Sequence, residues 1–315
     1  MTSQGYHDFL QRGGLVPLVG RAIVRFTGTD RTRYLNGQVT ANVQSLAAGH
    51  GLPACVTTAK GKLCAEGVVT NSGDALFFDA DPSIREALPP RFERYIIADD
   101  VVLEDMSDQI RLLHVLPGSI ESPVESLRED CKEMGISSVV SRFGKPGLDL
   151  FLPADAGDQL LSKIAQSGII LAEEDVEHLR IESGIPRWGF ELDENTLPPE
   201  AGLDRTHIDY HKGCYIGQEV ISRLKSVGHV NRRLVGFISQ DGTPLVKGAQ
   251  IFPASASTDA PCGLITSAGR SFALEKPIAL GYLRRSAPSG DLVSRSGEQG
   301  AEPVPVTLSE LPFTK

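Results

Sequence analysis

The octapeptide Lys212–Glu219 (KGCYIGQE) holds the residue types of this sequence that are best suited to chemistry. Cys214 lies between Gly213 and Gly217, and glycines allow tight or left-handed backbone conformations. An apolar run typical of a helix follows. A thiol just ahead of a helix N-terminus, with Lys212 nearby, should lose its proton more easily than a free cysteine. The pattern predicts a reactive thiolate, while a small buried cysteine in a glycine-bounded turn remains the structural alternative.

A metal site is a second interpretation of the same region. His207 and His211 are four residues apart, and with Cys214 they could form a three-ligand site with an open position. Gly213 and the approach to the turn argue against a continuous helix there, so ordinary loop histidines are favoured. We therefore predict no metal.

The elements that must position these residues mix strands and helices without strict alternation, which favours an α+β body with antiparallel sheets. The patterns predict strands over 22–26, 54–57, 67–70, 75–78, 95–97, 101–103 and 147–152. They predict helices over 30–35, 81–94, 122–134, 155–166 and 173–183, and one after the cysteine motif. From residue 233 onward strands and turns dominate and predict a separate small barrel or sandwich. The last dozen residues resemble a loose tail.

Composition narrows the classes of function. A chain of 315 residues is long for one core, so two or three lobes are expected. The net charge of −9, from 31 basic and 40 acidic residues, argues against a general nucleic-acid surface. Arg223, Lys225, Arg232 and Arg233 nevertheless cluster in the sequence, either as a local basic patch or as a solvated strand edge. No direct nucleic-acid partner is expected.

The cysteines and the apolar runs indicate the compartment. The five cysteines are scattered without a Cys-x-x-Cys pair, which argues against a disulfide framework or a self-sufficient zinc or iron–sulfur cage. No apolar run approaches the about 18–20 residues that span a bilayer, and the N-terminal residues do not resemble a signal peptide. A cytoplasmic protein without a membrane partner is expected.

The octapeptide resembles the Lys-Gly-Cys-Tyr-x-Gly-Gln-Glu signature of the YgfZ family. These proteins are folate-binding relatives of the glycine-cleavage T-protein and are linked to the maintenance of iron–sulfur enzymes. Further segments resemble that family in the same order along the chain, over roughly residues 30 to 285. They are Tyr34–Thr40 (YLNGQVT), Ala59–Lys62 (AKGK), Leu179–Pro186 (LRIESGIP) and Pro198–Leu203 (PPEAGL).

The resemblance implies the T-protein architecture. Two interleaved α+β lobes would surround a central folate channel, and a C-terminal β-barrel would follow. We expect the first lobe to be discontinuous, over residues 1–48 and 110–230, the second lobe over 49–109, and the barrel over 231–315.

The resemblance also implies a bound tetrahydrofolate or a derivative. Glu182 matches the T-protein glutamate that holds the pteridine, and a buried carboxylate suits the amide-like N–H and amino edge of that ring. Trp188 and Tyr215 could stack on the ring or pack in the core. Arg223 could meet the glutamate tail of the folate or lie on a solvated helix face.

One stretch departs from the T-protein. That enzyme has an Asp-Asp pair, of which one aspartate serves aminomethyl transfer to folate. The pair falls on Cys64 and Ala65 here, and neither can act as that carboxylate. Glu66 could substitute only if the register shifts by one residue. The departure argues against aminomethyl transfer from glycine.

The sequence therefore predicts a folate-binding protein that acts in iron–sulfur cluster assembly or repair and supports iron–sulfur enzymes, including those that thiolate tRNA. Cys214 would be a thiolate nucleophile or a transient sulfur or iron ligand, with Lys212 as its catalytic partner. Lys212, Tyr215, Gly217 and Gln218 would shape the turn and the channel mouth. One thiolate cannot hold a cluster alone, so assembly proteins or client enzymes are the expected partners. The alternatives are a folate-dependent aminomethyl- or methyltransferase and a non-catalytic partner protein of the assembly machinery.

Overall fold

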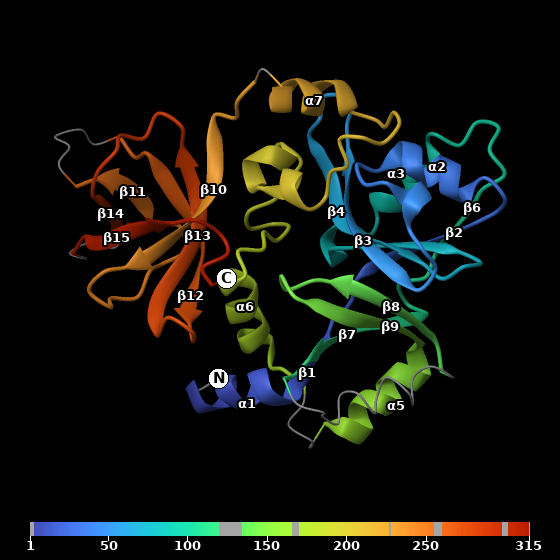
Figure 1. Ribbon diagram of the computed structural model, residues 1–315, viewed down its shortest axis with the longest axis horizontal. Helices are drawn as coiled ribbons and strands as arrows, with labels where there is room; N and C mark the ends of the chain where they lie inside the picture. The colour runs from blue at the N-terminus through green and yellow to red at the C-terminus, as the bar shows by residue number, and fades with distance from the viewer. Residues whose placement is uncertain are drawn as a thin grey trace. The chain divides into compact units, whose positions relative to one another are not determined.

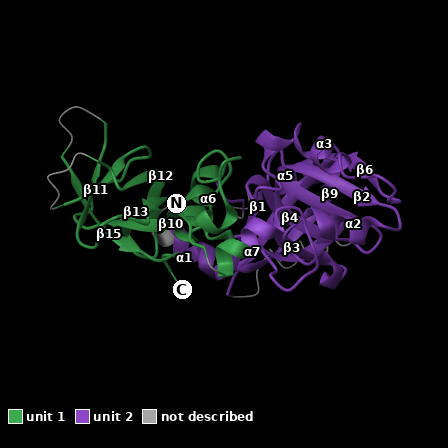
Figure 2. Cartoon of the chain, turned by 90° about the horizontal axis from the view of Figure 1, so that it is seen from above, with its two compact units in different colours: residues 1–3, 173–203, 223–315 green, residues 4–172, 204–222 purple. Residues whose placement is uncertain are grey.

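The computed structural model describes residues 3–119, 134–165, 170–226, 228–254, 260–297 and 302–314. The chain divides into two compact units (Figure 2). Unit 1 comprises residues 1–3, 173–203 and 223–315, and unit 2 comprises residues 4–172 and 204–222. The helix expected over 122–134 lies outside the described residues except at its last position. The predicted lobe boundaries stay a prediction.

Unit 2 is built on a nine-stranded sheet with the order β1-β7-β9-β8-β3-β4-β5-β2-β6. Neighbouring strands are antiparallel except β3 and β8, which make a single parallel pairing between His50 and Val139. Two antiparallel ladders are thereby joined edge to edge. The strands are β1 (Gly13–Pro17), β2 (Ala22–Thr27), β3 (His50–Thr57), β4 (Leu63–Asn71), β5 (Leu76–Ala80), β6 (Val102–Asp105), β7 (Ile110–Pro117), β8 (Ile136–Ser141) and β9 (Pro146–Pro153).

Short helices accompany the strands (Figure 1). The α-helices are α1 (Ser3–Arg12), α2 (Arg31–Gln38), α3 (Leu88–Glu93), α5 (Ala154–Ile164), α6 (Glu173–Glu182) and α7 (Gln218–Ser226). The 3-10 turns are η1 (Val43–Ser45), η2 (Pro82–Ile84), η3 (Pro198–Ala201) and η4 (Leu203–Arg205). In α5, Leu160 and Ile164 pack on the leucines of β7 and β9, as the apolar spacing predicts.

The region between β5 and β6 differs from the prediction. The helix expected over 81–94 is split into η2 and α3, because Pro89 and Pro90 have no N–H to continue a preceding helix. The strand expected over 95–97 does not form. The amides of Tyr95 and Ile96 instead donate to carbonyls of α3, so the helix ends in a turn.

The β-strands of unit 1 form a closed six-stranded barrel, drawn from orange to red in Figure 1. The order is β10-β13-β12-β11-β14-β15. The strands are β10 (Arg232–Ser239), β11 (Gln250–Pro253), β12 (Gly263–Ser271), β13 (Lys276–Arg284), β14 (Leu292–Arg295) and β15 (Val304–Ser309). Phe237, Ile251 and Ala279 lie fully buried in its core.

The expectation of a loose C-terminal tail is wrong. Residues 304–309 form β15 and close the barrel against β10 and β14. Leu311 and Phe313 then pack on a small core of Ile181 from α6 and Ile278 and Leu280 from β13. Strand β15 thus closes the barrel, with Val306 buried in its core, and Leu311 and Phe313 connect the end of the chain to α6.

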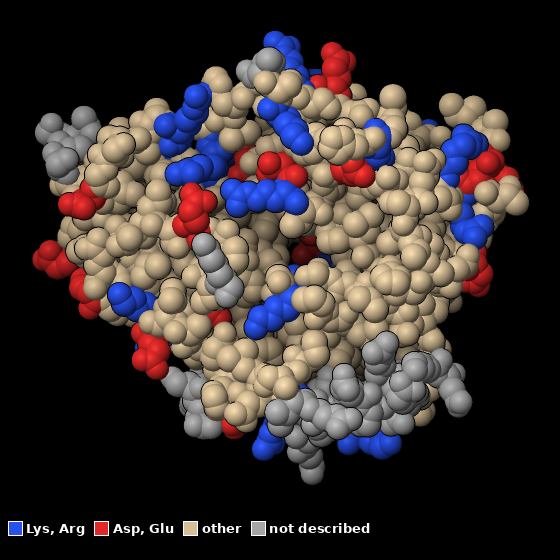
Figure 3. All heavy atoms as spheres, in the orientation of Figure 1, with Lys and Arg blue, Asp and Glu red and all other residues tan. Residues whose placement is uncertain are grey.

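Charges of both signs lie on one face of the molecule. On the face drawn in Figure 3, Lys and Arg side chains lie among Asp and Glu side chains. Within the described ranges, no helix has the length and apolar character needed to cross a membrane.

Candidate functional site

Lys212 anchors the cysteine motif within unit 2. Its side chain is buried, and Nζ donates to the carbonyl oxygens of Asn36 at 2.5 Å, Val39 at 2.8 Å and Ala41 at 2.6 Å. An ammonium has three N–H donors, so all three are used. Burial lowers the pKa of Lys212 to about 8, so the group still carries its third proton at neutral pH. The lysine thus caps the C-terminal end of α2, where helix carbonyls lack partners.

The N-terminal segment that resembles the family, Tyr34–Thr40, lies against the cysteine motif. Besides the Lys212 contacts, the Ile216 amide donates to the Gly37 carbonyl at 3.3 Å. The Thr40 hydroxyl donates to the His207 carbonyl at 2.6 Å. Segments 176 residues apart in the chain therefore form one structure.

A third segment completes this structure. The Thr57 hydroxyl, at the end of β3, donates to the Ile216 carbonyl at 2.5 Å. A Cβ added at Gly61 would lie 3.1 Å from the side chain of Val220 on α7. The Ala59–Lys62 turn is therefore packed against the residues that follow the cysteine. Three of the sequence segments that carry the family resemblance meet here.

The two glycines of the motif behave differently. Gly217 has φ +89°, and a Cβ there would lie 2.5 Å from the Thr58 carbonyl oxygen, so both conformation and space require glycine. Gly213 does not adopt a positive φ, and nothing lies within 4 Å of the position of its Cβ. Of the two glycines, which the sequence expected to allow tight or left-handed conformations, only Gly217 is left-handed.

Cys214 is exposed on the turn that this frame supports. Helix α7 begins at Gln218, four residues after the cysteine, so the expected position directly ahead of a helix N-terminus is wrong. The half-buried Gln218 opens α7 instead, and its amide donates to the Tyr215 carbonyl at 3.2 Å. The Lys212 ammonium donates all of its N–H groups to carbonyls at the C-terminal end of α2 and in the residues that follow it. The motif therefore offers an accessible thiol on a fixed turn.

Tyr215 is buried beside this turn. Its ring centroid lies 5.3 Å from Lys212 Nζ, and its hydroxyl has no hydrogen-bond partner among the described residues. Burial raises the pKa of Tyr215, and the nearby Tyr210 and Cys55 raise it further. Buried polar groups are nearly always paired, so an unpartnered hydroxyl of this kind suits a ligand or a water.

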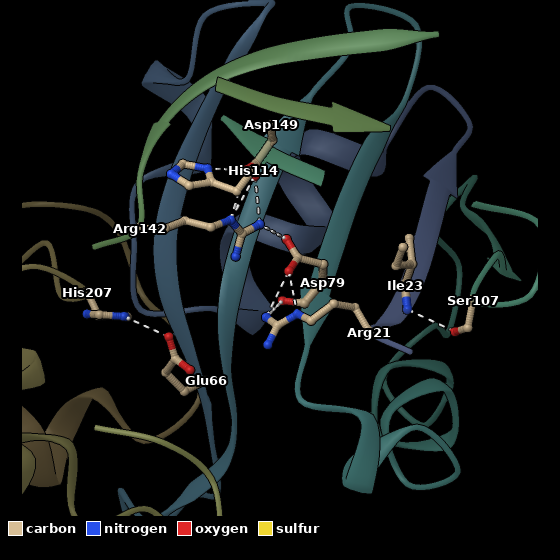
Figure 4. Close-up of polar contacts among 9 residues, drawn as sticks. All are labelled: Arg21, Ile23, Glu66, Asp79, Ser107, His114, Arg142, Asp149 and His207. Carbon is tan, nitrogen blue, oxygen red and sulfur yellow. Dashed lines mark hydrogen bonds and ion pairs between the residues drawn. The ribbon is translucent and has the colours of Figure 1, made fainter. Parts of the chain in front are cut away.

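Glu66 and His207 form a pair that was not among the predicted site residues (Figure 4). His207 Nε2 donates to Glu66 Oε1 at 3.0 Å. Burial raises the pKa of Glu66, but the hydrogen bond and charge of His207, with Arg21 and Arg142 nearby, hold that pKa below its usual value. A carboxylate beside an imidazole can move protons. His207 thus contacts a carboxylate of β4.

The ladder between β3 and β4 is irregular close to Glu66. Val56 pairs with Ala65 while Thr57 pairs with Leu63, so the register shifts by one residue at Cys64. Such irregularities redirect side chains and are common beside active sites. In the sequence, Glu66 matched a T-protein aspartate only if the alignment moved by one residue, which is separate from the pairing of the two strands.

A buried ion network lies in the same sheet (Figure 4). Arg142 contacts Asp79 and Asp149, each at 2.7 Å, while Arg21 also contacts Asp79 and the His114 Nδ1 lies 2.7 Å from Asp149. Burial raises the pKa of Asp149, but Arg142 and His114 lower it more, and the pKa lies below its usual value. The network joins β5, β7 and β9 and has no local sequence signal.

The other predicted ligand residues belong to unit 1. Glu182 is buried, and its Oε1 accepts hydrogen bonds from the Ser271 hydroxyl and, at 3.2 Å, from the Ala273 amide. The Glu182 carboxylate is therefore hydrogen-bonded to the end of β12 and the turn that leads to β13. Trp188 is half-buried in the loop after α6, and Arg223 is exposed on α7. Among the described residues, no group of three or more His, Cys, Asp or Glu is placed to hold a metal.

Comparisons with known proteins agree with this architecture. Residues 232–315 match the family model of the glycine cleavage T-protein C-terminal barrel domain. The "tRNA-modifying protein YgfZ" of Yersinia pestis (strain Pestoides F) is 27% identical over 229 residues, which cover 70% of this chain and 69% of that protein. An "Aminomethyltransferase" of Rubrobacter xylanophilus is 25% identical over 325 residues, which cover 96% and 83%.

The solved structures extend the likeness to the whole fold. The glycine cleavage system aminomethyltransferase T from Bartonella henselae matches with a TM-score of 0.83 at 16% identity, over 99% of this chain and 89% of that one. The fold is therefore that of the glycine-cleavage T-protein, an α+β architecture with a closed C-terminal barrel, as predicted. Within this fold class, the chain is similar to the YgfZ proteins.

Proposed function

We propose that this protein binds folate and acts in the assembly or repair of iron–sulfur clusters, and thereby supports iron–sulfur enzymes, including those that thiolate tRNA. Cys214 is the reactive group, as a thiolate nucleophile or a transient ligand of sulfur or iron. The similarity to proteins named as tRNA-modifying supports the last step. The reducing cytoplasm expected from the scattered cysteines is part of the proposal.

The observation that carries the proposal is that the thiol of Cys214 is exposed while the residues around it are buried or sterically fixed. The lysine and tyrosine on either side of Cys214 are buried, and Gly217 is sterically required, yet the cysteine itself faces solvent. A cysteine with a purely structural role would be buried itself and would not require a turn that holds it at the surface. Because a single thiolate cannot hold a cluster alone, the exposed position suits transfer to or from a partner that supplies the remaining ligands.

The residues present fit a folate in part. The Tyr215 hydroxyl is buried with no partner in the described part of the chain, so a polar atom of a ligand would satisfy it. Glu182 is a buried carboxylate at the end of α6, and a carboxylate suits the amide-like N–H and amino edge of a pteridine. A reduced folate supplies one-carbon groups when bound. In this proposal Glu182 orients the pteridine.

A calorimetric titration of tetrahydrofolate and its 5-formyl derivative tests the folate half. We expect saturable binding that Glu182→Gln and Tyr215→Phe both weaken. The exposed Glu194 provides a matched control, and Glu194→Gln should bind as the native protein does. No binding to the native protein would remove folate from the proposal and favour a partner protein that is indifferent to it.

A folate-dependent one-carbon transferase is a second candidate, favoured by the Glu66–His207 pair. This pair places the carboxylate of Glu66 directly after Cys64 and Ala65, the positions that match the T-protein aspartates. The imidazole of His207 can exchange a proton with that carboxylate. The aminomethyltransferase relative adds support. Formation of methylenetetrahydrofolate from an aminomethyl donor by the pure protein, abolished by Glu66→Gln, would establish this candidate. No product with the native protein would exclude it.

The cellular role is tested by removing the protein. Cells that lack it should lose activity of several iron–sulfur enzymes and thiolated tRNA nucleosides together, and the native chain should restore both. If the cells lose neither of these, that result would contradict the proposal, whatever the folate titration shows.

A further inference from the structure

The barrel unit carries an open groove of about 830 Å³ whose lining consists only of polar and charged residues. It lies where β10 begins and β13 ends. Three arginines line it (Arg232, Arg284 and Arg285), against one carboxylate, that of Glu200. No aliphatic residue and no Phe, Tyr or Trp is among those that line it, although such residues usually line a groove for an apolar ligand. The composition instead suits an anionic, strongly hydrated ligand.

The first two arginines are direct cross-strand neighbours. Arg232 on β10 pairs in register with Arg284 on β13. Like charges opposite one another destabilise a sheet unless a counter-charge is supplied. Glu200 supplies one for Arg232, whose Nε lies 2.9 Å from its Oε2. The same guanidinium lies over the Tyr282 ring, 4.2 Å from its centroid, so its plane is fixed.

The other two arginines keep an uncompensated charge. Arg284 and Arg285 are exposed, and within the described ranges neither guanidinium takes part in a salt bridge. The Arg285 amide donates to the Asn231 carbonyl at 2.9 Å. This hydrogen bond holds the segment that carries Arg284 and Arg285 against the start of β10. His229 and the Asn231 side chain add hydrogen-bonding groups to the same groove.

We propose that this groove binds the phosphodiester backbone of RNA. Guanidinium groups donate paired hydrogen bonds to phosphate oxygens, and arginine, asparagine and serine are common partners of phosphate and sugar. Each contact in an exposed groove is weak, so a polyanion that makes several contacts and releases counterions gains most. The groove concentrates positive charge locally in a chain of net charge −9. This site departs from the expectation that nucleic acid is not a direct partner.

The test compares fluorescently labelled single-stranded RNA with a polyglutamate peptide of similar charge, titrated by anisotropy over a series of salt concentrations. The doubly substituted Arg284→Gln/Arg285→Gln variant should bind RNA about tenfold more weakly or worse, and its salt dependence should fall by about 1.4 in slope for two lost contacts. The matched control is Arg233→Gln. Arg233 follows Arg232 on the same strand, so its side chain lies on the opposite side, and its partner is Glu310 at 3.7 Å.

The proposal predicts RNA binding that the double variant weakens and the control leaves unchanged, with all variants melting at the native temperature. Three results would overturn it: no RNA binding by the native protein at low salt, equal loss in the Arg233→Gln control, or polyglutamate binding as tight as RNA with the same dependence on Arg284 and Arg285. None of these results depends on whether folate binds.

Discussion

Lys212 and Cys214, two residues apart, occupy opposite environments. The lysine ammonium is buried with three backbone carbonyls around it, and the cysteine thiol faces solvent. The lysine therefore holds the turn in place, which is one of the two roles that the sequence predicted for it, the other being a catalytic role beside the thiol. We now assign Lys212 as a positioning residue, and this assignment leads to the first prediction.

Replacement of Lys212 by Met should destabilise the fold. The change leaves three buried carbonyls without a donor, and one unsatisfied buried group costs about 1–3 kcal/mol. We expect a loss of about 3 kcal/mol or more in the free energy of unfolding, measured by urea denaturation. Lys225→Met, at an exposed position on α7, is the control and should change the stability by less than about 0.5 kcal/mol. Equal effects of both changes would contradict the anchoring role.

The two motif glycines should tolerate alanine differently. Gly217→Ala places a Cβ against the Thr58 carbonyl in a left-handed backbone, at a cost of about 1–3 kcal/mol. Gly213→Ala meets open space and no positive φ, so its stability should stay near that of the native protein. Thermal unfolding of the two variants distinguishes these cases. A larger loss at Gly213 would show that the turn differs from the one described.

The buried ion network predicts a change in the pH dependence of stability. In the native protein the pKa of Asp149 is below its unfolded value, so this carboxylate stabilises the fold above its unfolded pKa. That contribution is lost as the pH falls through the lowered pKa. Arg142→Met removes the arginine from the buried Asp149, and burial should then raise the pKa of Asp149 above its unfolded value. The protonated form of Asp149 would become the favourable one in the fold.

The variant should therefore lose stability as the pH rises from about 4 toward neutrality, a range over which Asp149 already contributes its full stabilisation to the native protein. At neutral pH we expect a deficit of about 3–5 kcal/mol, because a broken buried pair leaves unpaired charge. Arg111→Met is the control. Arg111 pairs with Asp158 at the surface, so its loss should cost less than about 1 kcal/mol at any pH. Parallel pH profiles for native protein and Arg142→Met would refute this account.

Local patterns in the sequence predicted most of the elements and the barrel. Alternating apolar residues in β9 and the apolar face of α5 are short-range signals, and both elements form where expected. The contact of His207 with Glu66 spans 141 residues and leaves no local trace. The β3–β4 register shift likewise depends on a partner strand.

The cysteine motif itself was found, but its geometry was not. Gly217 and Gly213 look alike in the sequence, and only the neighbouring Thr58 carbonyl distinguishes their requirements. The role of Lys212 depended on where α2 ends in space, which the sequence alone could not give. The tail was misjudged because β15 gains its stability from pairing with β10 and β14 rather than from its own pattern.

The central claim is that the exposed thiol of Cys214 is required for the iron–sulfur role. The measurement is the activity of dependent iron–sulfur enzymes in cells that lack the native protein and carry Cys214→Ser, with Cys64→Ser, at a half-buried position on β4, as the control. We predict that Cys214→Ser folds normally and fails to restore activity, while Cys64→Ser restores it. Full restoration by Cys214→Ser would contradict the account.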